Sequence, residues 1–216
     1  REPEVGAWAF VDGDAVLNAA REIDAGPWRG ELHGLPIGVK DIIDTVDMPT
    51  AYGSALYRGH RPPWDAACVA LAREAGGLIL GKTVTTEFAT YHPGKTANPH
   101  ALDRTPGGSS SGSAAAVADG MVPLAFGTQT AGSVIRPAAY CGVVGFKPSY
   151  AMIPRAGVKP VAESLDTIGV FAREVEDVAL FAGVMAGRRW ELRDDLPPVR
   201  IGLCQTNEWD AALPET

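Results

Sequence analysis

Two serines and one lysine have surroundings that suit covalent chemistry. Ser109 and Ser133 each lie in a glycine-rich turn, at 107–113 and 127–133, and Lys40 ends an apolar run. Small residues directly before Ser133 let successive backbone amides converge on one point, which is the geometry that an oxyanion hole needs. A serine hydroxyl beside such amides, with a base in reach, is suited to nucleophilic attack on a carbonyl group.

The base in this set is expected to be the lysine, because every histidine precedes both serines. The histidines are His33, His60, His92 and His100. The serine–acid–histidine order of an esterase-type triad therefore cannot be completed within this chain. To act as a base near pH 7, Lys40 must be neutral, so its pKa must fall by about three units, a cost of about 4 kcal/mol. Burial among Ile37, Val39, Ile42 and Ile43 can lower the pKa of an amine that far.

Each of these residues also has a simpler interpretation. Lys40 could keep its amine at the surface, paired with Asp41, and Ser133 could cap a helix. The glycine/serine turn could be a flexible linker, although it runs straight into the helix-forming, apolar stretch 114–118. The combination of two glycine-flanked serines, a lone lysine and no usable histidine favours the catalytic interpretation.

Two further segments match known motifs letter for letter. The segment Gly76–Thr83 fits the phosphate-binding pattern G-x-x-x-x-G-K-[ST], so a nucleotide-binding module is the alternative from another functional class. A helix is expected before it, however, and its Leu-Ile-Leu run favours a strand, whose paired amides cannot wrap a phosphate. Residues 108–112 fit the nucleophile-elbow pattern G-x-S-x-G, but they follow a turn where an elbow requires a strand.

Apolar periodicity and turn residues predict alternating helices and strands around these turns. Helices are expected at residues 14–25, 64–75, 109–119 and 174–185, and strands at 35–40, 78–80, 122–126, 143–146, 167–171 and 199–203. This alternation indicates an α/β fold with a mixed, mainly parallel central sheet flanked by helices. The strand at 35–40 carries Lys40 at its end, and the turn at 107–113 feeds a helix whose positive end faces a polar site.

The composition narrows the set of partners and locations. The 216 residues carry a net charge of −7 without a Lys/Arg cluster, which disfavours nucleic acid or an anionic membrane as a partner. The three cysteines lie far apart and show no CxxC spacing. A disulfide framework or a zinc site is therefore not expected, and a cytoplasmic location is the default.

Both ends of the chain suggest a piece of something longer. It begins with Arg1 rather than methionine, and the strand expected at 199–203 opens without an obvious partner in what remains. Residues 1–216 are therefore expected to form the N-terminal catalytic half of a single domain, with the C-terminal half and the extreme N-terminus absent.

Three blocks of the sequence resemble the amidase signature family. They are Gly34–Asp41, Thr105–Ala114 and Gly127–Ser149. The spacings agree as well, since Ser109 follows Lys40 by 69 residues and Ser133 follows Ser109 by 24. The resemblance covers nearly the whole chain, and its motifs are very specific.

The resemblance implies a Ser–cis-Ser–Lys triad that hydrolyses a small amide without a metal or an organic cofactor. Ser133 is the implied nucleophile, which forms an acyl-enzyme, and Ser109, preceded by a cis peptide bond, relays its proton to neutral Lys40. The backbone amides of Thr130, Ala131, Gly132 and Ser133 are the implied oxyanion hole. The implied partner is the small-molecule amide substrate, and homo-oligomerisation is left open.

The sequence departs from the common family form Gly-Thr-Asp-Thr-Gly-Gly-Ser-Ile-Arg at three places. Gln129 stands for aspartate, Ala131 for glycine, and Arg136 follows the serine by three places instead of two. The place of the arginine is similar to that in malonamidase-like members, and implies that Arg136 binds the carboxylate of a small amide such as malonamate. An arginine here could equally brace the loop. The nearest alternative within the family is the A subunit of a tRNA-dependent amidotransferase, which hydrolyses glutamine and delivers ammonia to a partner.

Overall fold

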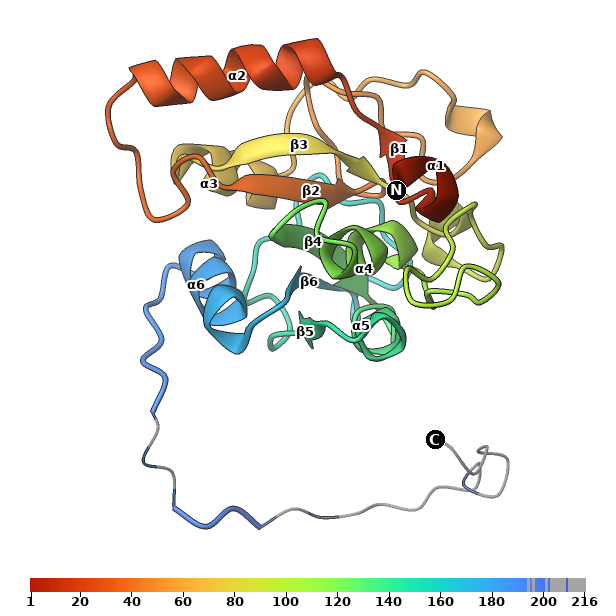
Figure 1. Ribbon diagram of the computed structural model, residues 1–216, viewed down its shortest axis with the longest axis vertical. Helices are drawn as coiled ribbons and strands as arrows, with labels where there is room; N and C mark the ends of the chain where they lie inside the picture. Colours follow the sequence, from red (N-terminus) through yellow and green to blue (C-terminus); the bar gives the residue numbers. More distant parts are fainter. Residues whose placement is uncertain (194, 196, 201, 203–208, 210–216) are drawn as a thin grey trace.

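The computed structural model describes residues 1–193, 195, 197–200, 202 and 209, over which strands and helices largely alternate (Figure 1). The strands are β1 (Trp8–Phe10), β2 (Pro36–Lys40), β3 (Leu78–Thr83), β4 (Leu124–Gln129), β5 (Val144–Phe146) and β6 (Thr167–Ala172). The helices are α1 (Glu2–Val5), α2 (Gly13–Ala25), α3 (Ala67–Glu74), α4 (Ser111–Ala118), α5 (Ile135–Cys141) and α6 (Val175–Met185). None of the described helices combines the length and apolar character that crossing a bilayer requires.

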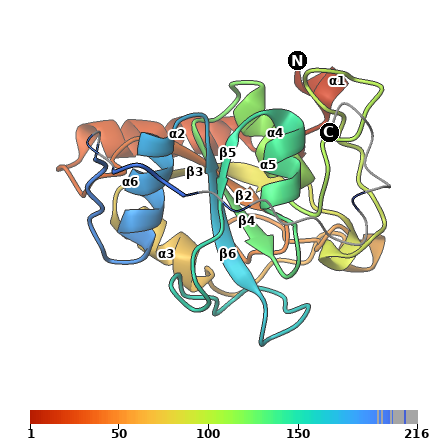
Figure 2. The ribbon, with the colours of Figure 1, turned by 90° about the horizontal axis from the view of Figure 1, so that it is seen from below.

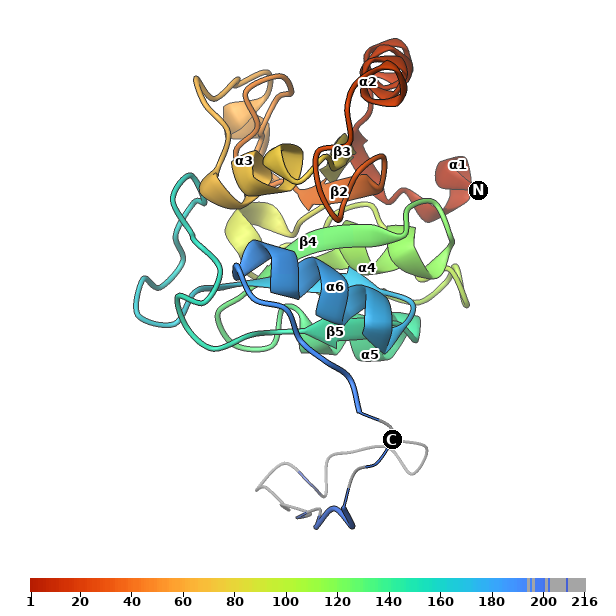
Figure 3. The same ribbon diagram turned by 90° about the vertical axis from the view of Figure 1, so that its left-hand side faces the viewer.

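The strands form one mixed sheet in the order β1-β3-β2-β4-β6-β5 (Figure 1). Figure 3 shows β3, β2, β4 and β5 following one another from top to bottom. β2 pairs in parallel with both β3 and β4, whereas the pairings of β1 with β3, β4 with β6, and β5 with β6 are antiparallel. The mixed α/β sheet flanked by helices is therefore confirmed. The expectation that the sheet is mainly parallel is wrong outside its three central strands, because β6 returns beside β4 in the opposite direction.

Helices cover both faces of this sheet and enclose two apolar cores. α3 and α6 lie on one face, and α4 and α5 lie on the other (Figure 2). Side chains of a strand alternate between its two faces. Accordingly, Leu124 and Phe126 of β4 belong to the core under α3 and α6, while Ala125 belongs to the core under α4 and α5.

One edge of the sheet collects the segments that matter for chemistry. Lys40, at the end of β2, is in register with Thr83 at the end of β3, and Gln129, at the end of β4, is in register with Thr167 at the start of β6. Since β2, β3 and β4 are parallel, their carboxyl ends lie together, and the antiparallel β6 begins at that same edge. Ligands of α/β sheets bind at this kind of edge.

Several predicted boundaries shift, each for a local reason. The helix predicted at 109–119 begins only at Ser111, because the two preceding serines belong to the turn that lines the site. The helix predicted at 64–75 begins at Ala67, because Ala66 has an extended backbone and donates its amide to the Asp44 carbonyl. The strand predicted at 78–80 continues to Thr83, and the strand predicted at 122–126 lies two to three residues later.

Three short elements and one late strand need separate mention. The structure adds α1, β1 and α5, which are too short to show a clear apolar period. The strand predicted at 199–203 includes Ile201 and Leu203, which lie outside the described residues, so it stays a prediction.

Candidate active site

Lys40 is buried at the end of β2 and contacts the first of the two serines. Its side chain has 0% exposure, and its Nζ is hydrogen-bonded to Ser109 Oγ at 2.7 Å. Burial holds the pKa of Lys40 well below its ordinary value, and the negative charge of Asp166 opposes this only in part. The interpretation of Lys40 as a surface residue paired with Asp41 is therefore wrong, and the amine has the environment of a base.

Thr128 supplies the other partners of this amine, and sequence reasoning missed it. Lys40 Nζ lies 2.8 Å from Thr128 Oγ1 and 3.4 Å from the Thr128 carbonyl oxygen. A neutral amine has two N–H groups and one lone pair. If both N–H groups donate to the oxygens of Thr128, the lone pair is left for the hydroxyl of Ser109. Thr128 thus orients the amine as a proton acceptor.

The two glycine-rich turns are tied to each other. The peptide bond Gly108–Ser109 is cis, as the resemblance implies. The next residue, Ser110, donates its backbone N–H to the Ser133 carbonyl at 3.3 Å, and its hydroxyl donates to the Thr128 carbonyl at 3.2 Å. Ser110 therefore links the turn of Ser109 to the turn of Ser133.

Ser133 lies at the wall of a cavity of about 460 Å³, at the turn that leads into α5. Ser109, Thr130, Ala131 and Arg136 line the same cavity. Among the described residues, the Ser133 hydroxyl has no hydrogen-bond partner. The hydrogen-bonded row that starts at Lys40 accordingly reaches Ser109, and Ser133 faces the shared cavity beside it.

The backbone amides in front of Ser133 are available to a ligand. Within the described part of the chain, no hydrogen bond uses the N–H of residues 130, 131, 132 or 133. Gln129 holds this loop from the inside, because its Oε1 accepts from the amides of Val134 and Ile135, and its Nε2 donates to the Ala131 carbonyl. An aspartate could accept from those amides but could not donate to the carbonyl, so glutamine makes one contact more.

Arg136 lies on the first turn of α5 and is exposed. Its Nε donates to the Gly108 carbonyl at 3.2 Å, directly before the bridging serine. The arginine thus has the loop-bracing contact and, at the same time, a place on the wall of the cavity.

The two other sequence motifs do not form sites of their own. Gly76–Thr83 is largely the strand β3, whose amides pair with β2, and Lys82 is buried in an ion pair with Asp41 at 3.2 Å. Lys82 Nζ also donates to Thr50 Oγ1 at 2.6 Å. The nucleotide-binding alternative is therefore contradicted. The segment 108–112 follows turn and irregular backbone instead of the strand that a nucleophile elbow requires.

Comparisons with known proteins agree with this geometry. A family model described as Amidase matches residues 1–214. The chain is 47% identical over 197 residues to the A subunit of the glutamyl-tRNA(Gln) amidotransferase of Symbiobacterium thermophilum, a match that covers 86% of this chain and 40% of that protein. The chain thus spans about 40% of the length of the curated relatives it matches.

Solved structures share the fold. The native peptide amidase of Stenotrophomonas maltophilia superimposes with a TM-score of 0.80 at 40% identity, covering 89% of this chain and 41% of that chain. A structure described as an amidase superimposes equally well, with a TM-score of 0.80 at 37% identity, and covers 88% of this chain and 46% of that chain.

Proposed function

The chain belongs to the amidase family, and on that premise we propose that it hydrolyses the C–N bond of a small amide through an acyl-enzyme on Ser133. The observation that carries the proposal is the contact at 2.7 Å between Ser109 and a buried lysine whose pKa burial lowers. Ser109 lines a cavity that also presents Ser133 and backbone amides without a hydrogen-bond partner among the described residues. A neutral amine at this place is the base that a serine nucleophile needs.

In the proposed reaction, Ser133 Oγ attacks the carbonyl carbon while its proton passes to Ser109 Oγ. The proton of Ser109 passes at the same time to the lone pair of Lys40 Nζ. The amides of residues 130–133 stabilise the oxyanion that forms. The proton then returns by the same route to the leaving nitrogen, the C–N bond breaks, and water hydrolyses the acyl-enzyme by a second passage through the same steps.

Covalent labelling tests the nucleophile and does not require that the substrate be identified. The full natural chain is incubated with a fluorophosphonate probe, and the adduct is measured by intact mass. We expect one adduct in the wild type, none in Ser133→Ala, and an unchanged adduct in Ser54→Ala, a buried serine that caps a turn away from the cavity. An adduct that persists in Ser133→Ala would reject Ser133 as the nucleophile.

We further propose that Arg136 contributes to substrate choice by pairing with a carboxylate on the amide, as in malonamate. Its guanidinium lines the cavity that Ser133 faces, and its Nη atoms make no hydrogen bond among the described residues. Arg136→Ala should raise the KM for malonamate at least tenfold more than the KM for a neutral amide of similar size. If the KM rises by the same factor for both amides, the only role of Arg136 is to brace the loop at Gly108.

A second candidate is the A subunit of a tRNA-dependent amidotransferase. It is favoured by the names of the relatives, of which several at 43–47% identity are glutamyl-tRNA(Gln) amidotransferase A subunits. In this case the substrate is glutamine, and the ammonia passes to a partner. Glutaminase activity that appears only with co-purifying subunits would support this candidate, whereas hydrolysis of free amides by the isolated protein would support the stand-alone amidase.

A further inference from the structure

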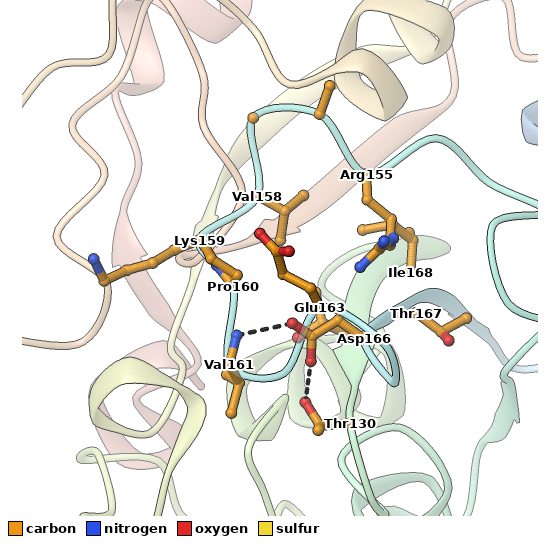
Figure 4. Close-up of a pocket in the computed structure, with 13 residues that line it drawn as sticks. Thr130, Arg155, Val158, Lys159, Pro160, Val161, Glu163, Asp166, Thr167 and Ile168 are labelled. Atoms are coloured by element: carbon orange, nitrogen blue, oxygen red, sulfur yellow. Dashed lines mark hydrogen bonds between the residues drawn. The ribbon is translucent and has the colours of Figure 1, made fainter.

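A buried carboxylate that the catalytic steps above do not use lies directly behind the oxyanion loop. Asp166 immediately precedes β6, and this residue is only 9% exposed. Its Oδ1 accepts a hydrogen bond from Thr130 Oγ1 at 2.5 Å (Figure 4). Its Oδ2 accepts from the backbone amides of Val161 and Ala162 at 2.8 and 3.0 Å. One side chain therefore ties the loop after β4 to the loop before β6.

The three contacts of Asp166 suit a carboxylate. Each of its oxygens accepts at least one hydrogen bond, and the Thr130 hydroxyl and the two amides are all donors in this arrangement. An asparagine could keep these contacts only with its carbonyl oxygen toward the two amides and its NH₂ group donating to Thr130 Oγ1, and it would carry no negative charge.

Asp166 lies at the same edge of the sheet as Lys40. Asp166 precedes Thr167, which is in register with Gln129, next to the Thr128 that contacts Lys40. The negative charge of Asp166 raises the pKa of Lys40 against the larger, opposite effect of burial. A carboxylate at this place stabilises a positive charge on the amine.

We propose that Asp166 is a positioning residue of the hydrolase: it fixes Thr130 at the start of the oxyanion loop and stabilises the ammonium that Lys40 becomes when it takes the relayed proton. The inference rests on the proposed function, because it assigns Asp166 a part in that same reaction. When the tetrahedral intermediate forms, its oxyanion and the ammonium of Lys40 are the two charges that appear in the site, and both then depend on one carboxylate.

Most of the other charged groups nearby have partners of their own. Arg155, Lys159 and Glu163 line a cavity of about 410 Å³ together with Asp166 and Thr130 (Figure 4). The Lys159 amine lies over the rings of Tyr52, Tyr57 and Phe88, and the Arg155 guanidinium donates to Tyr150 Oη. On the strand side, Asp41 is paired with Lys82. Asp44, the remaining carboxylate of this region, accepts from Tyr52 Oη.

The test is the pH dependence of fluorophosphonate labelling in the full natural chain. Labelling needs neutral Lys40, so its rate rises with pH through the pKa of that amine and then reaches a plateau. We expect Asp166→Asn to lower the plateau at least tenfold and to move the acid limb about 1 pH unit lower, since the charge that favours the ammonium is gone. Thr130→Val should lower the plateau without moving the limb, and Thr130→Ser should restore it.

Glu163→Gln is the matched control, because it removes one negative charge from the cavity that Asp166 lines, and among the described residues the Glu163 side chain makes no hydrogen bond to Thr130. Its plateau and acid limb should equal those of the wild type. If Asp166→Asn fails to fold, Asp166→Glu and the Thr130 pair carry the test: a longer carboxylate should keep the limb within a few tenths of a pH unit while lowering the plateau.

The outcomes separate this inference from the one on which it rests. Labelling that persists in Ser133→Ala would overturn both. Two outcomes would overturn the role of Asp166 alone, provided that labelling depends on Ser133. One is an acid limb that lies at the same pH in Asp166→Asn and in the wild type, and the other is an acid limb that Glu163→Gln displaces as far as Asp166→Asn does. If Thr130→Val leaves the plateau unchanged, Asp166 does not act on the oxyanion loop through Thr130.

Discussion

Replacing Thr128 by valine removes one hydroxyl from the site and keeps the shape of the side chain. That hydroxyl lies 2.8 Å from Lys40 Nζ, in a residue that is only 8% exposed. In the variant, one N–H of the neutral amine loses its acceptor and turns toward Ser109 Oγ, the next oxygen within reach at 2.7 Å. The lone pair then no longer faces the proton that it must accept.

The size of the effect follows from the buried donor that is left without a partner. An unsatisfied N–H in a closed environment costs about 1–3 kcal/mol. The arrangement with the lone pair on Ser109 is disfavoured by that amount, and a penalty of about 2 kcal/mol slows the reaction about 30-fold. We therefore expect Thr128→Val to lower the plateau rate of fluorophosphonate labelling about 30-fold, and Thr128→Ser to restore most of it.

The assay needs a control for the loss of a buried threonine hydroxyl as such. Thr45 is fully buried and donates to the Met48 carbonyl at 3.4 Å, away from the cavity of Ser133. Thr45→Val should lower the thermal midpoint without changing the labelling rate. If Thr128→Val labels within twofold of the wild type at every pH, the orientation of the amine by Thr128 is refuted.

Three further changes test the packing and charge of the site. Lys40→Met should abolish labelling and raise the free energy of unfolding at neutral pH, because the folded wild type disfavours the protonated amine that the unfolded chain holds. In urea titrations at several pH values, this gain in stability should shrink as the pH rises toward about 10.5, the ordinary pKa of lysine. Gly112→Ala should destabilise by about 3 kcal/mol or more, since the new Cβ would meet backbone atoms at 2.2 and 2.3 Å, whereas Gly13→Ala, with open space around it, should change the thermal midpoint little. Lys82→Met should cost about 3–5 kcal/mol in urea unfolding by leaving the Asp41 carboxylate buried without its cation, and adding Asp41→Asn should recover part of that loss.

The reactive groups could be predicted because their types and spacing already restrict the chemistry. Ser109 and Ser133 follow small residues that are typical of tight turns, and Lys40 ends an apolar run that is typical of a buried strand. The strands and longer helices follow from apolar periodicity for the same reason, since burial on one or both faces leaves a pattern in the chain.

The residues that support these groups could not be predicted in this way. Thr128, Asp166 and Gln129 act through contacts that depend on strand register and on loop conformation. Thr128 meets Lys40 because β4 lies beside β2, and Asp166 meets Thr130 because β6 begins opposite the end of β4. Threonine and aspartate are common near strand ends, so neither residue stands out before the sheet order is known.

Two buried lysines on neighbouring strands show what makes one of them a base. Lys40 and Lys82 are both fully buried, and burial lowers the pKa of each. Lys82 has the Asp41 carboxylate at 3.2 Å, which favours its charged form. Within the part of the chain that the structure describes, Lys40 has only hydroxyl and carbonyl oxygens within hydrogen-bond distance. Asp41 follows Lys40 in the chain, but it lies in the turn after β2, where its carboxylate pairs with Lys82 of the neighbouring strand β3. The difference in partner, at equal burial, leaves Lys40 free to lose its proton and keeps Lys82 in a structural ion pair.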